Sequence, residues 1–328
     1  AYCSDGVRRP YRKFPTALYS YDANGLLVFP QGFRRAVTSL LLESGYTVTE
    51  VCCDGPRSRP NCFEFRPERV FELLGPNAFR PKQADALAAI ASNEGGLIGA
   101  ATAFGKTQLI LMACLSFPNA KITIVADGQE VAMTIRNRLM AHIPGVGLVG
   151  AGKRNFGRRI TVFVADSLHH EPHDPEGEPD IVFFDEVHGA ASPSNLERLA
   201  RYQRARMFGL SASLFKRSDN ADHRLEGIFG PLIFNLTVPE AEALGLVSPV
   251  LVEMISVEMS SNPADKLTQD TARERAAIWN NEYRNQMVAD QARRFPDDVQ
   301  VLIMVKSIEH GLRLRKLLPE FEFCYDKI

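Results

Sequence analysis

From about residue 80, short apolar runs alternate with amphipathic stretches along the chain. The apolar runs have the length of strands and few polar residues: GGLIGA (95–100), AKITIVAD (120–127), ITVFVADSL (160–168), DIVFFDE (180–186) and ARMFGLSA (205–212). Between them, 81–93, 106–117, 130–143 and 194–203 carry apolar residues at helical spacing. Strands that are apolar on both faces are typical of a parallel sheet covered by helices on both sides. The pattern therefore predicts an α/β fold.

The N-terminal region has a different pattern. Residues 15–52 suit a β-β-α-β unit with DANG as its first turn, and the following stretch, rich in Pro, Arg and Cys, suits a connection. With 328 residues, the chain is long enough for about two domains.

Composition and charge exclude several classes of protein. Apolar residues make up 45% and charged residues 23%, as in ordinary globular proteins, and the net charge of -1 excludes a global basic field. Any nucleic-acid binding must therefore rest on local patches. No apolar run reaches the roughly 18 residues of a membrane span, so no membrane partner is expected. The six cysteines lack zinc-ligand spacing, and we expect reduced thiols and a cytoplasmic location.

The stretch GAATAFGKT (99–107) joins the first apolar run to the helix that follows it. A tight loop at this place presents backbone N–H groups and the positive end of a helix dipole, which together suit a polyphosphate. Gly105 allows close approach of the backbone, Lys106 reaches the terminal phosphates, and the Thr107 hydroxyl can bind Mg²⁺. Ala100 and Ala103 stand where such loops often have glycine. The alternative is a simple strand-to-helix turn.

A pair of carboxylates ends a second buried strand, IVFFDEVH (181–188). An ATPase needs one carboxylate for Mg²⁺ and another to orient and deprotonate the attacking water. Asp185 and Glu186 can supply both functions. The alternative is an acidic pair that only ends a strand, which is less plausible after a phosphate loop in the same sheet.

The order A-x-x-x-x-G-K-T, D-E-x-H, S-A-S resembles motifs I, II and III of superfamily 2 helicases and translocases. FRPKQADAL (79–87) resembles the element that recognises adenine in this superfamily, and residues 227–250 resemble the segment leading to a second RecA-like domain. The resemblance covers about residues 73–328 and points to the branch with XPB-type, phage UvsW-type and restriction-translocase-type proteins.

The resemblance implies a RecA-like fold that uses ATP and Mg²⁺. Asp185 would bind the metal with Thr107, Glu186 would be the catalytic base, and His188 would link the nucleotide to motif III. Adenine would contact Arg80 and Gln83. The implied phosphate-binding residues are Thr102, Ala103, Phe104, Gly105, Lys106 and Thr107. The implied coupling residues are Ser211, Ala212 and Ser213, whose alternative is a small-residue turn.

The nucleic-acid partner, DNA rather than RNA, would contact the loops of motifs Ia and Ib and a basic hairpin between them. Ala126–Asp127 replaces the usual Pro-Thr of motif Ia. The hairpin GKRNFGRR places Phe156 among basic residues, which suits a phosphate backbone, although a solvated hairpin is an equal alternative. The candidate contacts are Asp127, Gly128, Lys153, Arg154, Arg158, Arg159 and Ser167.

The resemblance also predicts the domain organisation: a small αβ domain (1–72), an ATP-binding RecA-like domain (73–245) and the start of a second RecA-like domain (246–328). In the last, strands at 248–259 and 299–307 and helices at 271–295 and 308–318 are expected. Motifs V and VI of the superfamily are not found, so we expect a chain truncated within the second domain that binds ATP, hydrolyses it poorly and does not translocate.

Two other functions stay open: the motor part of a restriction enzyme, and a nucleotide-gated nucleic-acid-binding module that does not translocate. LHHEPHD, with His169, His170, His173 and Asp174, could bind a metal, but its surroundings favour an acidic, proline-rich loop.

Overall fold

The computed structural model describes residues 19–21, 25, 27–48, 61–157, 159–170, 178–188, 195, 198–199, 202, 205–212, 222–257 and 262–324. The chain divides into two compact units, Ala1–Pro249 and Val250–Ile328. The predicted boundary between residues 72 and 73 has no counterpart in this division, and the three-domain organisation stays a prediction.

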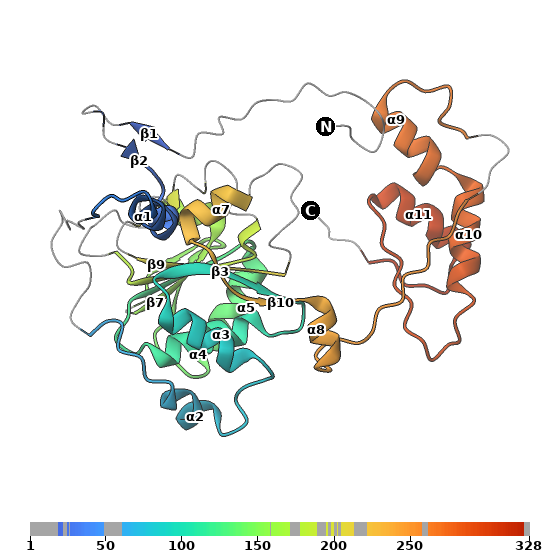
Figure 1. The fold of residues 1–328 in the computed structure, drawn as a ribbon. Coiled ribbons are helices and arrows are strands. Elements are labelled where there is room, and N and C mark those ends of the chain that lie inside the picture. The colour runs from blue at the N-terminus through green and yellow to red at the C-terminus, as the bar shows by residue number, and fades with distance from the viewer. Residues whose placement is uncertain are drawn as a thin grey trace. The chain divides into compact units, whose positions relative to one another are not determined.

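The first unit is built around one twisted sheet (Figure 1). Within the described residues it has eight strands; seven are parallel, and only the edge strand β6 runs antiparallel to its neighbour. In order across the sheet they are β10 (Leu232–Leu236), β3 (Gly95–Ala100), β9 (Arg206–Ser211), β8 (Ile181–Asp185), β4 (Ile122–Ala126), β7 (Ile160–Val164), β5 (Gly147–Gly150) and β6 (Lys153–Asn155).

Helices cover both faces of this sheet. In β8, Ile181 and Phe183 face one core, and Val182 and Phe184 face the other, because successive side chains of a strand point to opposite sides. The helices against the first core are α2 (Glu68–Leu74), α3 (Gln83–Ser92), α4 (Lys106–Ser116), α5 (Gln129–Met140) and α8 (Val238–Ala243). Those against the second are η2 (Ala165–His170) and α7 (Asp222–Phe229). The α/β class and the five central strands predicted from the sequence are confirmed.

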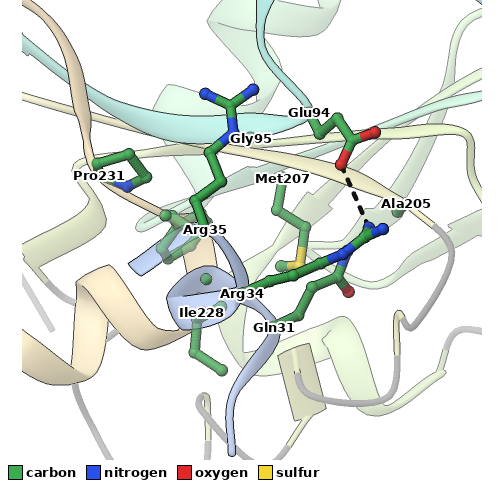
Figure 2. A pocket seen from close by; sticks show the side chains of 12 residues that line it. Gln31, Arg34, Arg35, Glu94, Gly95, Ala205, Met207, Ile228 and Pro231 are labelled. Atoms are coloured by element: carbon green, nitrogen blue, oxygen red, sulfur yellow. Dashed lines mark hydrogen bonds and ion pairs between the residues drawn. The ribbon is translucent and has the colours of Figure 1, made fainter. Parts of the chain in front are cut away.

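The N-terminal elements are β1 (Ser20–Tyr21), β2 (Leu27–Val28), η1 (Gln31–Phe33) and α1 (Arg34–Glu43). The predicted strand after α1 lies partly outside the described residues. η1 packs closely on α7, since a Cβ on Gly32 would overlap the carbonyl oxygen of Glu226. Figure 2 shows Arg34 reaching Glu94 (3.4 Å) across a small pocket at the amino-terminal ends of β3 and β9. This pocket lies at the edge of the sheet opposite the predicted nucleotide site.

The second unit differs from its prediction in two ways. The helix expected over 271–295 is divided into α9 (Asp270–Glu274), the π-helical η4 (Arg275–Trp279) and α10 (Glu282–Ala292), because the Asn281 side chain accepts from the Arg284 N–H and starts a new helix. The helix expected at 308–318 is confirmed as α11 (Ile308–Leu317).

Among the described residues, the two strands expected in the second unit are not formed. Neither 250–257 nor 301–305 pairs as a strand, and Leu251 and Met304 are 95% and 88% exposed. Strands need neighbours that complete their hydrogen bonds and cover their apolar face, and two short segments without a larger sheet do not provide this. None of the described helices is both long and apolar enough to cross a lipid bilayer.

Candidate nucleotide-binding site

Three neighbouring strands bring the candidate chemistry together at their carboxyl ends. β9 lies between β3 and β8, so the loop after β3 and the acids that end β8 open on the same edge of the sheet. The Lys106 ammonium donates to Glu186 Oε1 at 2.5 Å, although the two residues are 80 positions apart in the sequence. Their side chains are 15% and 35% exposed, so the ion pair is partly shielded from solvent yet open to a ligand.

The loop between β3 and α4 has the backbone of a phosphate-binding turn. Gly105 (φ 90°) directly precedes α4, and the start of this helix has no side-chain cap. The first N–H groups of α4 are therefore available to an anion. Ala103 also lies in the left-handed region (φ 70°), which explains why glycine suits this position. Thr102 and Ala103 are exposed, and Thr107 is half-buried in the first turn of α4.

Two residues of the predicted adenine element, Arg80 and Gln83, support this loop through hydrogen bonds. Gln83 Nε2 donates to the Phe104 carbonyl at 2.8 Å, and Gln83 Oε1 accepts from the Arg80 N–H. Arg80 donates to the Ala103 carbonyl at 3.1 Å. Gln83 is fully buried, so in this structure its amide supports the loop and is not accessible to a base; the exposed Arg80 stays a candidate for adenine.

Phe104 is also buried, and its ring packs against Phe234 of β10 with 5.6 Å between centroids. Its side chain therefore anchors the loop in the core, and the predicted phosphate contact of Phe104 stays a prediction for its backbone N–H. Only its backbone belongs to the phosphate loop.

These backbone conformations predict effects of different size for two substitutions. Gly105→Ala should destabilise the protein by about 1–2 kcal/mol, because it forces a side chain into the left-handed region and places Cβ 2.8 Å from Gln83 Nε2. Ala103→Gly should change the free energy of unfolding by less than about 1 kcal/mol. Glycine removes the strain of the left-handed backbone, and this gain offsets the larger conformational entropy that glycine gives the unfolded chain. Urea denaturation checks both. Equal losses in the two variants would contradict this account of the loop.

The acids after β8 have different environments. Asp185 is buried and accepts the Glu186 N–H at 3.2 Å. Burial raises the pKa of Asp185, an effect that the nearby Lys106 opposes and the Glu186 carboxylate reinforces. A divalent cation would remove this cost of burying the carboxylate. Glu186 has a left-handed backbone (φ 53°), which turns its carboxylate towards Lys106. No sequence signal indicates this conformation.

The end of β9 meets the same carboxylate. The Ser211 hydroxyl lies 3.5 Å from Glu186 Oε2 and 3.2 Å from His188 Nδ1, and His188 Nδ1 lies 3.4 Å from Glu186 Oε2. The structure thus joins Lys106, Glu186, His188 and Ser211 in one network. Ala212 is exposed beside it, and Ser213 lies outside the described residues. The coupling function of Ser211, Ala212 and Ser213 stays a prediction.

The nucleic-acid candidates are spread over the carboxyl-terminal side of β4 and β7 and the sheet edge beyond. Asp127 is exposed, Gly128 precedes α5, and Ser167 is half-buried in η2. The basic hairpin expected between motifs Ia and Ib is formed by β5 and β6, with Lys153 and Arg154 exposed on the edge strand. Phe156 is 41% exposed and packs edge-on against Phe163.

Arg159 has a different function from the one expected. Its guanidinium donates to the Phe117, Cys114 and Ala120 carbonyls at 3.0, 3.2 and 3.4 Å, around the end of α4. Burial lowers the pKa of this guanidinium. Its donors bind backbone carbonyls in the last turn of α4 and in the residues after it, and they are not directed at a phosphate backbone. Arg158 lies outside the described residues.

Cysteines and histidines form no further site among the described residues. Cys114 and Cys324 are free thiols, and burial raises the pKa of Cys114 to about 12. The rings of His169 and His170 are tilted against each other with 3.9 Å between centroids, while His173 and Asp174 lie outside the described residues. No group of three or more potential metal ligands from His, Cys, Asp and Glu is found in the described part of the chain.

Residues 77–216 match the family model described as "Type III restriction enzyme, res subunit". In its fold, the chain is similar to the UvsW helicase from bacteriophage T4 (TM-score 0.50, 16% identity, 65% of this chain and 80% of that chain). A second structure of T4 UvsW has a TM-score of 0.49 and 15% identity, over 91% of this chain and 62% of that chain. The Hef helicase domain from Pyrococcus furiosus has a TM-score of 0.41 and 16% identity, over 51% of this chain and 39% of that chain. No curated protein matches the sequence significantly.

The matched segment spans the phosphate loop, the acid pair and the strand that ends in Ser211, which are the elements that the structure brings together. The first T4 UvsW structure shares the RecA-like fold of this sheet. Residues 77–216 of this chain are therefore similar to the res-subunit family of type III restriction enzymes, and they lie in a sheet with the RecA-like fold.

Proposed function

We propose that this chain belongs to the motor of an ATP-dependent DNA helicase or translocase, in which ATP and Mg²⁺ bind at the carboxyl ends of β3 and β8. The observation that carries the proposal is the contact of Lys106 with Glu186 beside the buried Asp185. An ammonium that could bind a phosphate, a carboxylate that could bind the metal and a second carboxylate that could act as the base thus lie close together.

The residues suit a nucleoside triphosphate with its metal ion. The uncapped start of α4 and the Lys106 ammonium would bind the terminal phosphates, and Thr107 and Asp185 would hold Mg²⁺. When bound, the metal supplies charge neutralisation on the phosphates. Glu186 would orient the attacking water and take its proton. Lys106 must then exchange part of its contact with Glu186 for a phosphate, which frees the carboxylate for the water.

The network of Glu186, His188 and Ser211 would connect nucleotide state to nucleic-acid binding, because Ser211 ends the strand next to both nucleotide loops. DNA is proposed as the partner because the motifs resemble the DNA-translocating branch of the superfamily. A restriction-enzyme motor is the second candidate, favoured by the description of the matching family.

The decisive test is ATP hydrolysis by the full-length protein with single-stranded DNA, duplex DNA, forked DNA and RNA. Stimulation by DNA and movement of a labelled strand or displacement of a bound protein are expected. Stimulation by RNA alone would overturn the choice of DNA. DNA binding that depends on nucleotide, without stimulated hydrolysis, would replace the motor by a nucleotide-gated binding module.

We expect the exposed cations of the hairpin, Lys153 and Arg154, to contribute measurably to DNA affinity. Lys153→Ala with Arg154→Ala should lower affinity and flatten the dependence of log K on log salt by up to about two units, because each lost phosphate contact removes about 0.9. Fluorescence anisotropy at several salt concentrations measures this. Arg159 is left unchanged because it caps α4.

The matched control is Arg34→Ala with Arg35→Ala, which removes the same charge at the amino-terminal edge of the sheet (Figure 2). Its salt dependence should equal that of the parent. If the two double variants behave alike, the hairpin is only a solvated turn and DNA binds elsewhere.

A further inference from the structure

The backbone at Glu186 needs support from its surroundings. Glu186 has φ 53°, a conformation that side-chain-bearing residues rarely adopt and that persists only when neighbouring structure holds it. The turn decides where the carboxylate lies, because Asp185 still belongs to β8 and the chain leaves the sheet directly after it. Whatever holds the next residue therefore also positions Glu186.

Val187 is that next residue, and it is fully buried. It belongs to the core on one face of the sheet, together with Leu97 of β3, Phe184 of β8 and Met207 of β9. The chain therefore turns at Glu186 and returns Val187 onto this face. The side chain of Val187 is branched at Cβ and has little rotational freedom to adapt to a new neighbour.

The space for Val187 exists because residue 209 has no side chain. Gly209 lies in β9, in register with Phe184 on one side and Leu97 on the other. A Cβ at this position would lie 2.7 Å from Val187 Cγ2 and 3.2 Å from Val187 Cβ. Since both the base and a branch of Val187 are too close, a change of rotamer does not relieve the contact. Leu97 Cδ2, at 3.0 Å, is the flexible end of a side chain and can yield.

We propose that Gly209 is a positioning residue for Glu186: by leaving room for Val187 on β9, it holds the turn that directs the carboxylate to the nucleotide. This inference rests on the proposed function, because it assigns to Gly209 a part in the proposed ATPase site. Gly209 touches neither nucleotide nor metal and acts through Val187.

A methyl group at residue 209 moves Val187 away from β9 and changes the adjoining turn. The Glu186 carboxylate then shifts relative to Lys106, 2.5 Å away, and Ser211, 3.5 Å away. The phosphate loop follows a different strand and keeps its support from Gln83. Loss of the base position should therefore lower turnover and spare nucleotide binding.

The test is a cycle of four proteins: the parent, Gly209→Ala, Val187→Ala and the double variant. Gly209→Ala should lower kcat on the order of 100-fold, as expected for a reacting group displaced by about 1 Å, with the Kd of a fluorescent ATP analogue within about twofold of the parent. Val187→Ala should also lower kcat, because the turn loses its anchor. The kcat of the double variant should exceed that of both single variants, since the methyl group at residue 209 fills the space that the truncated Val187 side chain leaves.

The position of Glu186 is measured separately in the nucleotide-free protein by the ¹³C signal of its side-chain carboxyl, assigned by its disappearance in Glu186→Gln. This signal should move in Gly209→Ala and return towards the parental value in the double variant. If Gly209→Ala does not fold, Val187→Ala and the double variant still give the comparison of kcat and carboxyl shift.

The control is Gly227→Ala in α7, where a Cβ would lie 2.9 Å from the Phe33 ring. It should reduce stability and leave the carboxyl signal and kcat unchanged. The proposal would be overturned if the Glu186 carboxyl signal of Gly209→Ala equals that of the parent. It would also be overturned if the kcat of the double variant is no higher than that of Gly209→Ala. A parent without ATPase activity that depends on Glu186 would instead refute the proposed function, and the carboxyl signal would still decide the position of Glu186.

Discussion

In the full-length protein, replacing Glu186 by glutamine should lower ATP turnover by at least about 100-fold and leave ATP bound as tightly as before, or more tightly. The amide keeps the shape of the side chain but cannot take a proton from water, and general-base catalysis contributes about 10²–10⁴-fold. In the nucleotide-free site the carboxylate also holds Lys106 at 2.5 Å. The amide holds Lys106 less strongly, so the ammonium is freer to meet a phosphate.

Steady-state hydrolysis in the presence of DNA and calorimetric titration with a slowly hydrolysed ATP analogue give the two quantities. Glu240→Gln is a suitable control, because Glu240 caps α8 through Thr237 and is not part of the site. Parental turnover in Glu186→Gln, with the protein folded, would show that another group is the base.

Lys106→Ala should weaken ATP binding by about 10–100-fold. A hydrogen bond to a charged group contributes about 1.5–3 kcal/mol, and each 1.4 kcal/mol is a factor of ten in affinity. The same substitution breaks the ion pair with Glu186, but that carboxylate is 35% exposed and can be solvated. We therefore expect loss of affinity with little loss of stability.

Isothermal titration with ATP and Mg²⁺, together with thermal unfolding, separates the two effects. Lys316→Ala removes an exposed lysine from α11 and should bind ATP as the parent does. Unchanged affinity in a folded Lys106→Ala protein would remove the basis for placing the triphosphate at this loop.

The central fold could be predicted because its signal is local. The five central strands of the sheet are apolar on both faces, and apolar residues in the helices between them recur at helical spacing, so the α/β architecture follows from short windows of sequence. The second unit was harder for the same reason. Residues 301–305 have the composition of a strand, but composition does not supply a neighbouring strand, and the segment stays unpaired.

The candidate site was predictable in its residue types and less so in their functions. Lys106, Asp185 and Glu186 were identified from the motifs, and the structure brings the lysine and the acids together. Arg159 has the same charge as Arg154, but its surroundings assign it to the end of α4. Gln83 belongs to the adenine motif, but its burial behind the phosphate loop gives it a supporting function in this structure.

The sequence by itself determined the parallel sheet, the two loops that carry a cation and two acids, and their common edge, because periodicity and motif order depend on neighbouring residues. Three-dimensional packing determines which side chains find hydrogen-bond partners and which positions leave room for a neighbouring side chain. The left-handed turn at Glu186 and the empty position at Gly209 depend on contacts between β8 and β9, whose residues are about 25 positions apart in the chain. Such contacts follow from packing in three dimensions, and no local pattern of residues encodes them.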